Sequence, residues 1–424
     1  MTQGSLDAQL GESARIVARV AAGASLAEEF GQPRAHSGSG SRAALIDLTH
    51  GTLRRYGRVQ AIVGSLSRRV TFDELVQALL WCALYALESG RYGEHTVVDQ
   101  AVRACGLLER WAAKGYVNAL LRRFLRERSA IDAQIASDAV AKYQHPGWWI
   151  ELARAAYPHN WQKVLAAGNE HPPMCLRVNR RRAEISEYQA ELARQGMAAR
   201  RCGPQALLLE RAVPVDRLPG FAQGKVSVQD LGAQRAGYAL DLRAGQRLLD
   251  ACAAPGGKSA HVLELEDIEL TAIDVDPARA ARIAPNLERL GLRSEVRVAD
   301  ASQPDQWWDG RAFDRILADV PCTASGIVRR HPDVKWLRRE SDVAAFAERQ
   351  RAILAALWRV LAPGGKLLYA TCSVFPQENE DVVEQFAARH AGANRAAPAD
   401  GLPPQWLPDG EHDGFYYALI EKKV

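Results

Sequence analysis

Two cysteines stand where buried strands are expected to end. The segment Phe313–Cys322 reads FDRILADVPC, and the segment Leu367–Ser373 reads LLYATCS, with Cys372 near its end. In an open α/β sheet, ligands bind outside the carboxyl ends of the strands, so we expect both thiols to face one crevice. A lone free cysteine is more often a buried apolar residue. Two of them at adjacent strand ends, beside Asp319, indicate a catalytic site instead.

A thiolate is needed when the atom to be alkylated is a poor nucleophile, such as C5 of a pyrimidine. Its attack at C6 pushes electron density onto C5, which then takes a methyl group from a sulfonium donor. Asp319 would hold the edge of the base and stabilise the charge that develops on the ring. A base must afterwards remove the C5 proton, and the second cysteine is a candidate for that step. These arguments leave open whether Cys322 or Cys372 attacks.

A glycine turn between an expected strand and an expected helix predicts a site for a nucleotide-like cofactor. The segment Leu248–Ser259 reads LLDACAAPGGKS. Its glycines let the backbone approach a ligand closely, and the helix N-terminus supplies free N–H donors. The spacing is neither that of a P-loop nor that of the G-x-G-x-x-G fingerprint.

Two aspartates follow that turn at the ends of the next two expected strands. Asp274 lies 18 residues after Gly256, where a carboxylate can accept hydrogen bonds from ribose hydroxyls, and Asp300 could bind an adenine amino group. An isolated aspartate in such a place is more often a helix cap or a loop carboxylate. With Asp319, three acidic strand ends in register favour a binding site.

These residues require a sheet of parallel strands to position them. From Gln246 onward, apolar strands alternate with helical patterns, which predicts a doubly wound parallel sheet. The expected strands are Arg247–Ala251, Leu270–Val275, Glu295–Ala299, Phe313–Ala318 and Lys366–Ala370.

The rest of the chain predicts two further domains. Apolar residues three and four apart from Ala14 to Ile135 predict an all-α bundle, interrupted by a Gly- and Ser-rich loop at Gly31–Ser41. Helices over 148–167 precede a small α+β module with strands at Met174–Asn179 and Ala206–Leu209 and a helix between them. We therefore expect domains at 1–138, 139–230 and 231–424.

Composition excludes several classes of protein. Of 424 residues, 47% are hydrophobic and 25% charged, as in a soluble globular protein. The longest apolar stretch is half of the roughly 20 residues that a membrane span needs, and the start of the chain has no signal-peptide pattern. The seven cysteines include no C-x-x-C pair. We expect a cytoplasmic monomer with reduced thiols, no metal and no membrane partner.

Charge is distributed unevenly along the chain. Residues 1–130 carry 17 Lys and Arg against 12 Asp and Glu, whereas residues 231–424 carry 24 against 28. A basic first half joined to a less basic catalytic half is typical of a protein that binds nucleic acid, although solvated helices also carry excess arginine.

The motifs together resemble the RNA 5-methylcytosine methyltransferases of the Sun type, in particular their bacterial 16S rRNA branch. The resemblance spans nearly the whole chain and includes a NusB-like helical domain with Lys114–Arg123 (KGYVNALLRR). It implies a multidomain fold with an all-α NusB-like bundle, a small α+β linker module and a Rossmann-like methyltransferase domain. The catalytic motifs that carry it are Asp250–Ser259, Asp319–Cys322, Arg329–Trp336, Ala370–Ser373 and Glu378–Glu380.

The resemblance implies a role for each matched residue. Cys372 would be the nucleophile, Cys322 would release the product, Asp319 would contact both cofactor and base, and Lys258 would contact the base. S-adenosylmethionine would be the cofactor, with Asp274 at its ribose and Asp300 at its adenine. The loop that holds it would consist of Cys252, Ala253, Ala254, Pro255, Gly256, Gly257 and Lys258.

The partner that the resemblance implies is 16S rRNA, with cytosine-967 as the target. The target base must leave any stack to reach the thiols. Backbone contacts from arginines would position the RNA without reading its sequence. The candidate arginines are Arg122 and Arg123 in the bundle and Arg180, Arg181 and Arg182 after the linker strand.

Three alternatives stay open at this stage. An exocyclic amino methyltransferase of the same fold would carry an Asp/Asn-Pro-Pro-aromatic motif where this chain reads Asp-Val-Pro-Cys at 319–322. A non-catalytic RNA-binding factor would bind RNA tightly without affinity for S-adenosylmethionine. The same chemistry could also act on tRNA or 23S rRNA.

Overall fold

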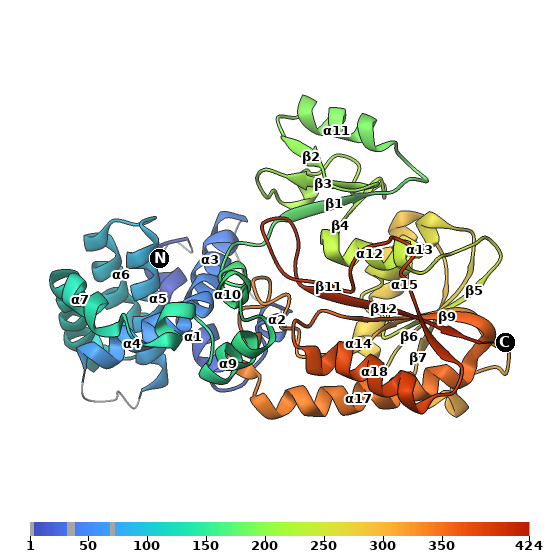
Figure 1. Ribbon diagram of the computed structural model, residues 1–424. Helices are drawn as coiled ribbons and strands as arrows, with labels where there is room; N and C mark the ends of the chain where they lie inside the picture. Colours follow the sequence, from blue (N-terminus) through green and yellow to red (C-terminus); the bar gives the residue numbers. More distant parts are fainter. Residues whose placement is uncertain (1–3, 32–38, 68–72, 424) are drawn as a thin grey trace. The chain divides into compact units, whose positions relative to one another are not determined.

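The computed structural model describes residues 4–31, 39–67 and 73–423 (Figure 1). The chain separates into two compact units: unit 1 comprises Met1–Glu170 with Val328–Arg339, and unit 2 comprises His171–Ile327 with Glu340–Val424. Of the expected loop at Gly31–Ser41, residues 32–38 lie outside the described ranges. Gly31 ends one helix, and residues 39–41 begin the next.

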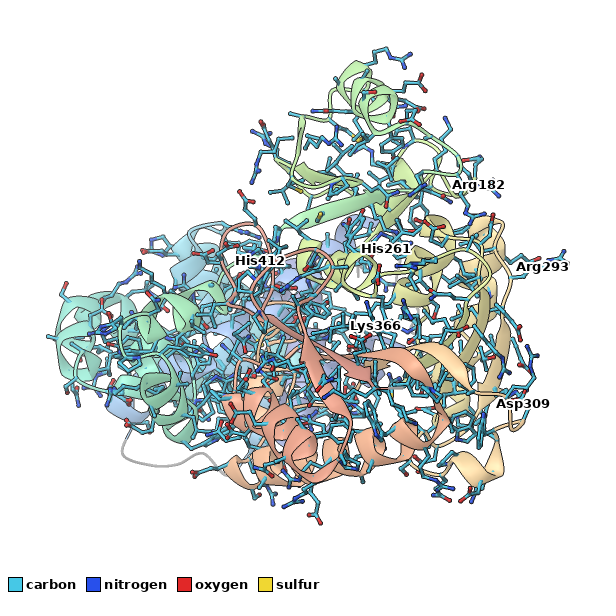
Figure 2. All side chains as sticks on the ribbon, turned by 45° about the vertical axis from the view of Figure 1, so that its right-hand side comes forward. Arg182, His261, Arg293, Asp309, Lys366 and His412 are labelled. Carbon is cyan, nitrogen blue, oxygen red and sulfur yellow. The ribbon has the colours of Figure 1, made fainter. Side chains whose placement is uncertain are left out.

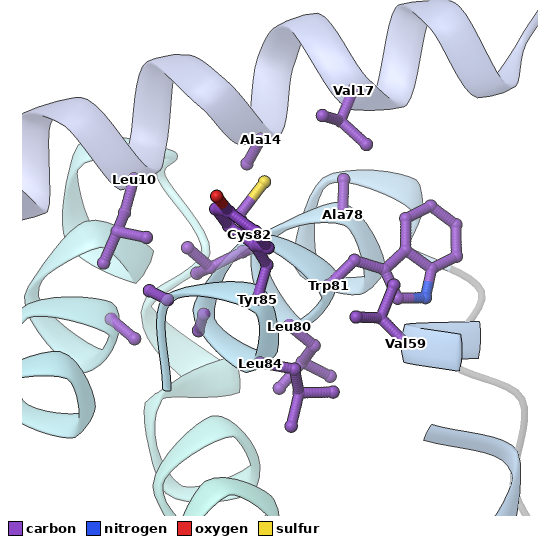
Figure 3. Close-up of a cluster of buried hydrophobic side chains, with 14 of the residues drawn as sticks. Leu10, Ala14, Val17, Val59, Ala78, Leu80, Trp81, Cys82, Leu84 and Tyr85 are labelled. Carbon is purple, nitrogen blue, oxygen red and sulfur yellow. The ribbon is translucent and has the colours of Figure 1, made fainter. Parts of the chain in front are cut away.

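Unit 1 is helical, as the apolar periodicity predicts. Its central helix α5 (Glu74–Ser89) begins where the Asp73 side chain accepts a hydrogen bond from the amide of Val76, and it is buried at every position from Ala78 to Leu87. Figure 3 shows its Trp81 and Cys82 packed near α1. The other helices of this part of unit 1 are α1 (Leu6–Ala21), α2 (Leu26–Gly31), α3 (Ser39–Arg54), α4 (Tyr56–Leu66), α6 (Glu94–Leu107), η1 (Trp111–Ala113), α7 (Lys114–Ile135), α8 (Ala139–Tyr143), α9 (Gly147–Ala156) and α10 (Trp161–Ala167).

A segment from the second half of the chain completes unit 1. Helix α16 (Val334–Leu337) carries Lys335, whose side chain is fully buried. Burial, and next the Arg54 guanidinium, lower the pKa of Lys335 well below its usual value. The Lys335 Nζ donates to three oxygens, at 3.3 Å from Arg54 O, 2.8 Å from Gln144 O and 2.8 Å from Asn169 Oδ1.

The small module of unit 2 is an antiparallel sheet with one helix beside it. It contains the expected strands and helix as β1 (Met174–Val178), β3 (Ala206–Leu209) and α11 (Ile185–Arg194), and its strand order is β2-β3-β1-β4. The elements that the sequence did not predict are β2 (Ala199–Arg201), η2 (Val215–Arg217) and β4 (Val226–Val228).

The second part of unit 2 is a sheet of order β10-β12-β9-β8-β5-β6-β7. The five expected strands are present and parallel, as predicted, and the sheet also contains antiparallel strands that the sequence did not predict. The C-terminal strand β12 pairs antiparallel with β9, and β10 and β11 pair antiparallel with β12. The strands are β5 (Arg247–Ala251), β6 (Glu269–Asp274), β7 (Glu295–Val298), β8 (Phe313–Asp319), β9 (Leu361–Thr371), β10 (Ala393–Ala396), β11 (Gln405–Trp406) and β12 (Phe415–Lys422).

Helices cover both faces of this sheet, and each face has its own apolar core. One core joins the sheet to α17 (Glu340–Val360) and α18 (Glu380–Arg389). The other joins it to α12 (Leu231–Ala239), α13 (Gly257–Leu265) and α15 (Ile283–Leu290). Because both faces are covered, functional side chains must project from the strand ends. The short helices are α14 (Pro277–Ala280), η3 (Pro304–Gln306) and η4 (Pro376–Glu378).

Replacing Lys335 by methionine is expected to loosen unit 1. Met keeps the apolar stem but removes the donors, leaving buried carbonyl oxygens unsatisfied, so local opening should become easier by about 1–3 kcal/mol. Hydrogen exchange with mass spectrometry measures this in peptides that contain Arg54 and Gln144. Lys163→Met, at an exposed position of α10, is the control. Equal exchange in both variants would contradict the prediction.

Candidate active site

The two cysteines that the sequence singles out lie side by side at one edge of the sheet. Strands β8 and β9 are parallel, and their register pairs Asp319 with Ala370. Cys322 follows three residues after Asp319, and Cys372 two residues after Ala370. The two Sγ atoms are consequently 3.4 Å apart. One substrate atom placed at this edge would therefore face both thiols.

The two thiols differ in their surroundings. Cys322 is buried, whereas Cys372 is partly accessible. The hydrogen bond with Cys372 and then burial raise the pKa of the Cys322 thiol well above its usual value. The less accessible sulfur therefore keeps its proton more firmly, and the partly accessible sulfur of Cys372 is the one that a substrate can reach.

An ion pair connects the cofactor-loop lysine to the acid at the strand end. The Lys258 Nζ lies 2.6 Å from Asp319 Oδ2 and 5.4 Å from the centre of the Phe415 ring. Burial opposes its charge, but the Asp319 carboxylate, with Tyr417 and Cys372 nearby, raises the pKa of Lys258. A largely buried ammonium group therefore lies beside Asp319 and interacts electrostatically with Cys372.

The glycine turn has the backbone shape of a ligand cradle. It runs from the end of β5 to α13, and Gly256 has φ +91°, where a Cβ atom would be 3.1 Å from Ile283 Cγ2. The turn is tied to the next strand because the amide of Ala254 donates to Asp274 Oδ2 at 3.1 Å. Asp250 is fully buried and accepts a hydrogen bond from Ser259.

One feature of this cradle fits a cationic or hydroxyl-bearing ligand. Within the described ranges, Asp250 Oδ1 has no hydrogen-bond partner, and burial raises the pKa of this carboxyl to about 7. A bound group with an N–H or O–H donor would satisfy such an oxygen. The residues at the turn are thus compatible with an adenosyl amino acid cofactor.

The other two predicted cofactor acids occupy the expected strand ends and make local hydrogen bonds. Asp274, nearly fully buried, also accepts a hydrogen bond from the amide of Asp276 and lies 3.4 Å from the Arg279 guanidinium. Asp300 accepts hydrogen bonds from the amide and hydroxyl of Ser302, at 2.9 and 2.7 Å. Burial acts to raise the pKa of Asp300, but these hydrogen bonds lower it overall. Both acids accept backbone hydrogen bonds from residues two positions after them, and their contact with a cofactor stays a prediction.

The structure adds a residue that the sequence did not single out. Arg177 of β1 is buried and forms an ion pair with Glu264 of α13 at 2.7 Å. Its Nη1 also donates to the carbonyl oxygen of Gly257 at 2.9 Å, at the first residue of the cofactor helix. The small module therefore supports the glycine turn. A charged residue in the otherwise apolar strand MCLRV was the available signal.

The predicted RNA-contacting arginines differ in how free their side chains are. Arg122 is exposed on α7 and bonds only locally to Asn118, whereas Arg123 pairs with Glu127. Arg181 pairs with Asp267, and Arg182 donates to the carbonyl oxygens of Leu290 and Gln223 (Figure 2). Arg180 is exposed directly before them. Arg181 and Arg182 thus join the small module to the catalytic part of unit 2.

The described residues contain no group of three or more His, Cys, Asp or Glu side chains arranged to hold a metal ion. No helix within the described ranges is both long and apolar enough to cross a membrane.

The fold and the strand-end site define a methyltransferase, and comparisons with known proteins agree. Three family models match the chain: 16S rRNA methyltransferase RsmB/F over residues 237–421, an RsmF/B-like ferredoxin-like domain over 145–216 and the NusB family over 14–126. The chain is 42% identical to the ribosomal RNA small subunit methyltransferase B of Vibrio cholerae, covering 92% of this chain and 91% of that one.

Solved structures are also similar to this chain in fold and in sequence. The crystal structure of PH0851 is 25% identical, covers 98% of this chain and 99% of its own, and has a TM-score of 0.80. A methyltransferase homologue from Pyrococcus horikoshii is 26% identical, covers 67% of this chain and 98% of its own, and has a TM-score of 0.58. The chain belongs to the RsmB/F family of small-subunit rRNA methyltransferases.

Proposed function

We propose that this protein methylates C5 of one cytosine of 16S rRNA, cytosine-967, through a covalent adduct between Cys372 and C6 of the base. The observation that carries the proposal is the pair of thiols 3.4 Å apart beside the Lys258–Asp319 ion pair. Two thiols serve a reaction in which one bond to sulfur is made and broken while a proton is removed from the same ring. Methylation of an exocyclic amino group needs neither thiol.

In the proposed reaction Cys372 is the nucleophile. Its sulfur is partly accessible, and the ammonium group of Lys258 interacts with it electrostatically. The Cys372 sulfur forms a bond to C6, and the electron pair of the C5–C6 double bond moves toward C5 and the ring carbonyl. Asp319 shares a proton with N3 of the base and, with the ammonium group of Lys258 beside it, offsets the charge that develops on the ring.

Cys322 takes part in the second half of the reaction. After C5 has received the methyl group, it carries both that group and its original hydrogen. Cys322 relays this proton to a water molecule, giving its own proton to the water as it accepts the one from C5, and the electron pair of the C5–H bond restores the double bond. The bond between C6 and Cys372 breaks in the same step.

We propose S-adenosylmethionine as the cofactor, held by the turn at residues 252–258. When bound, it supplies a methyl group on a sulfonium centre. Asp274 would accept hydrogen bonds from its ribose hydroxyls and Asp300 from its adenine amino group, and the unpartnered oxygen of Asp250 would accept one from its ammonium group. The N-terminus of α13 and the left-handed turn at Gly256 would contact it through the backbone.

The RNA would contact both units through its phosphates. Arg122 and Arg180 have exposed side chains, and we propose that they bind the RNA backbone together with Arg123, Arg181 and Arg182. We also propose that the chain works as a monomer in the cytoplasm, with neither a metal nor a membrane partner. The domains proposed for it are residues 1–138, 139–230 and 231–424.

Labelled S-adenosylmethionine is expected to transfer its methyl group to one cytosine of unmodified 16S rRNA. Parallel reactions with tRNA and 23S rRNA should stay unlabelled, and digestion to nucleosides should yield 5-methylcytidine. Label in another RNA would overturn the proposed substrate and keep the chemistry. An absence of label in every RNA, with cofactor binding confirmed, would favour a non-catalytic RNA-binding protein unless assembled subunits are methylated.

Cys372→Ala is expected to abolish methyl transfer, because no sulfur remains to attack C6. Affinity for S-adenosylhomocysteine, measured by calorimetry, should stay that of the unchanged protein. Cys82→Ala, a buried thiol in unit 1, is the matched control and should keep full turnover. Retained turnover in the Cys372 variant would show that another group attacks.

Cys322→Ala is expected to trap the covalent intermediate, because the C5 proton then has no acceptor and the bond to C6 cannot break. A slower band on a denaturing gel, sensitive to ribonuclease, measures the adduct. The double variant that also lacks Cys372 should show no such band. Normal turnover without the band would remove Cys322 from the mechanism.

A further inference from the structure

A single buried carboxylate contacts the residue that follows each thiol. Glu378 lies in η4, and its side chain is fully buried. Its Oε1 accepts a hydrogen bond from the amide of Thr323 at 2.8 Å, and its Oε2 accepts one from the Thr323 hydroxyl at 2.5 Å. The same Oε2 accepts a third hydrogen bond, from the Ser373 hydroxyl, at 2.6 Å. Thr323 follows Cys322, and Ser373 follows Cys372.

Glu378 is also held from the sheet and from a helix. Tyr369 of β9 donates its hydroxyl to the carbonyl oxygen of Glu378 at 2.5 Å. Gln350 of α17 accepts a hydrogen bond from Tyr369 at 3.0 Å, and its amide donates to Glu378 Oε1 at 3.4 Å and to Pro321 O at 2.9 Å. The carboxylate is therefore held by elements outside the two cysteine loops. A displacement of either loop would lengthen a hydrogen bond to a fixed acceptor.

Stability alone does not account for a carboxylate at this place. The hydrogen bonds to the Glu378 carboxylate come from neutral groups, namely the Thr323 amide and hydroxyl, the Ser373 hydroxyl and the Gln350 amide, and burial raises its pKa. Burying an unpaired carboxylate is costly, and a neutral side chain would fill the space at lower cost. Its value lies in its geometry, because two oxygens with several lone pairs can hold three donors at once.

We propose that Glu378 is a positioning residue that holds the Cys322 loop and the Cys372 loop in one fixed relation, so that both thiols act on the same base. This inference rests on the proposed function of the two thiols. Because Glu378 contacts both loops, it affects both adduct formation at Cys372 and product release through Cys322. In this proposal Glu378 acts on both steps through the two loops and not through contact with the cofactor or the RNA.

The first test compares Glu378→Ala with Glu378→Gln. The alanine variant is expected to lose on the order of 100-fold in kcat, the size of effect that a misplacement of about 1 Å produces. KM for the RNA and affinity for S-adenosylhomocysteine should stay unchanged. The glutamine variant should recover most of kcat, because its amide oxygen accepts from the Thr323 amide and its NH₂ group donates to the two hydroxyls.

A matched control lies six residues further along the chain. Glu384 is an exposed residue of α18 and lies outside the motifs that carry the chemistry. Glu384→Gln is expected to keep the kcat of the unchanged protein. If Glu378→Ala behaves like this control, the positioning role is wrong. Loss of cofactor affinity in both Glu378 variants, in parallel with lost stability, would also overturn the proposal.

The second test separates the two arms of the carboxylate. Ser373→Ala should slow formation of the covalent adduct in single-turnover reactions, whereas Thr323→Val should slow its release, so that adduct accumulates. Glu378→Ala should slow both steps. These variants also keep the proposal falsifiable if Glu378→Ala does not fold. Equal rates in all three variants and the unchanged protein would overturn it.

The controls distinguish this inference from the proposed function. If the unchanged protein forms no adduct and transfers no methyl group, the proposed function itself fails. If the unchanged protein methylates RNA and Glu378→Ala does so at the same rate, only the positioning role fails.

Discussion

The parallel pairing of β8 with β9 is the constraint on which the candidate site depends. Its register places Asp319 beside Ala370, and the amide of Val320 donates to Ala370 O at 3.1 Å just beyond the strand end. The two strands therefore end at the same edge of the sheet, and the thiols that follow them lie 3.4 Å apart. A shift of one residue in this register would turn every side chain of one strand to the other face. The close approach of two thiols that are 50 positions apart in the sequence thus depends on backbone hydrogen bonds between these strands.

Buried polar groups hold the loops that the sheet leaves free. Arg177 connects the small module to the cofactor helix through Glu264, and Glu378 connects the loops that follow Cys322 and Cys372. In unit 1, Lys335 holds three separate oxygens. Each group loses its hydrogen bonds to water on burial, and protein partners replace them only when all of those partners are in place. Such groups contribute less to stability than to the choice of one arrangement among several of similar packing.

Much of the fold followed from local pattern. The five parallel strands, the small α+β module and the helical first part were predicted because apolar periodicity differs between strands and helices. The antiparallel strand β12 was missed, although Phe415–Lys422 is strongly apolar, because a pattern does not state which neighbour a strand pairs with. The segment 328–339 was also unexpected in unit 1, since its contacts with Arg54 and Asn169 join residues more than 160 positions apart.

The sequence by itself determined which chemistry the chain carries: two thiols, three strand-end acids and a glycine turn, each recognisable from residue type and from its place after an apolar strand. Tertiary structure decided how those groups meet. It set the distance between the Cys322 and Cys372 sulfurs, paired Lys258 with Asp319 and placed Glu378 between the two cysteine loops. The physical reason is the distance along the chain over which each kind of interaction acts. Strand and helix preferences act over a few neighbouring residues, whereas these contacts depend on sheet register and on burial, which only the folded chain provides.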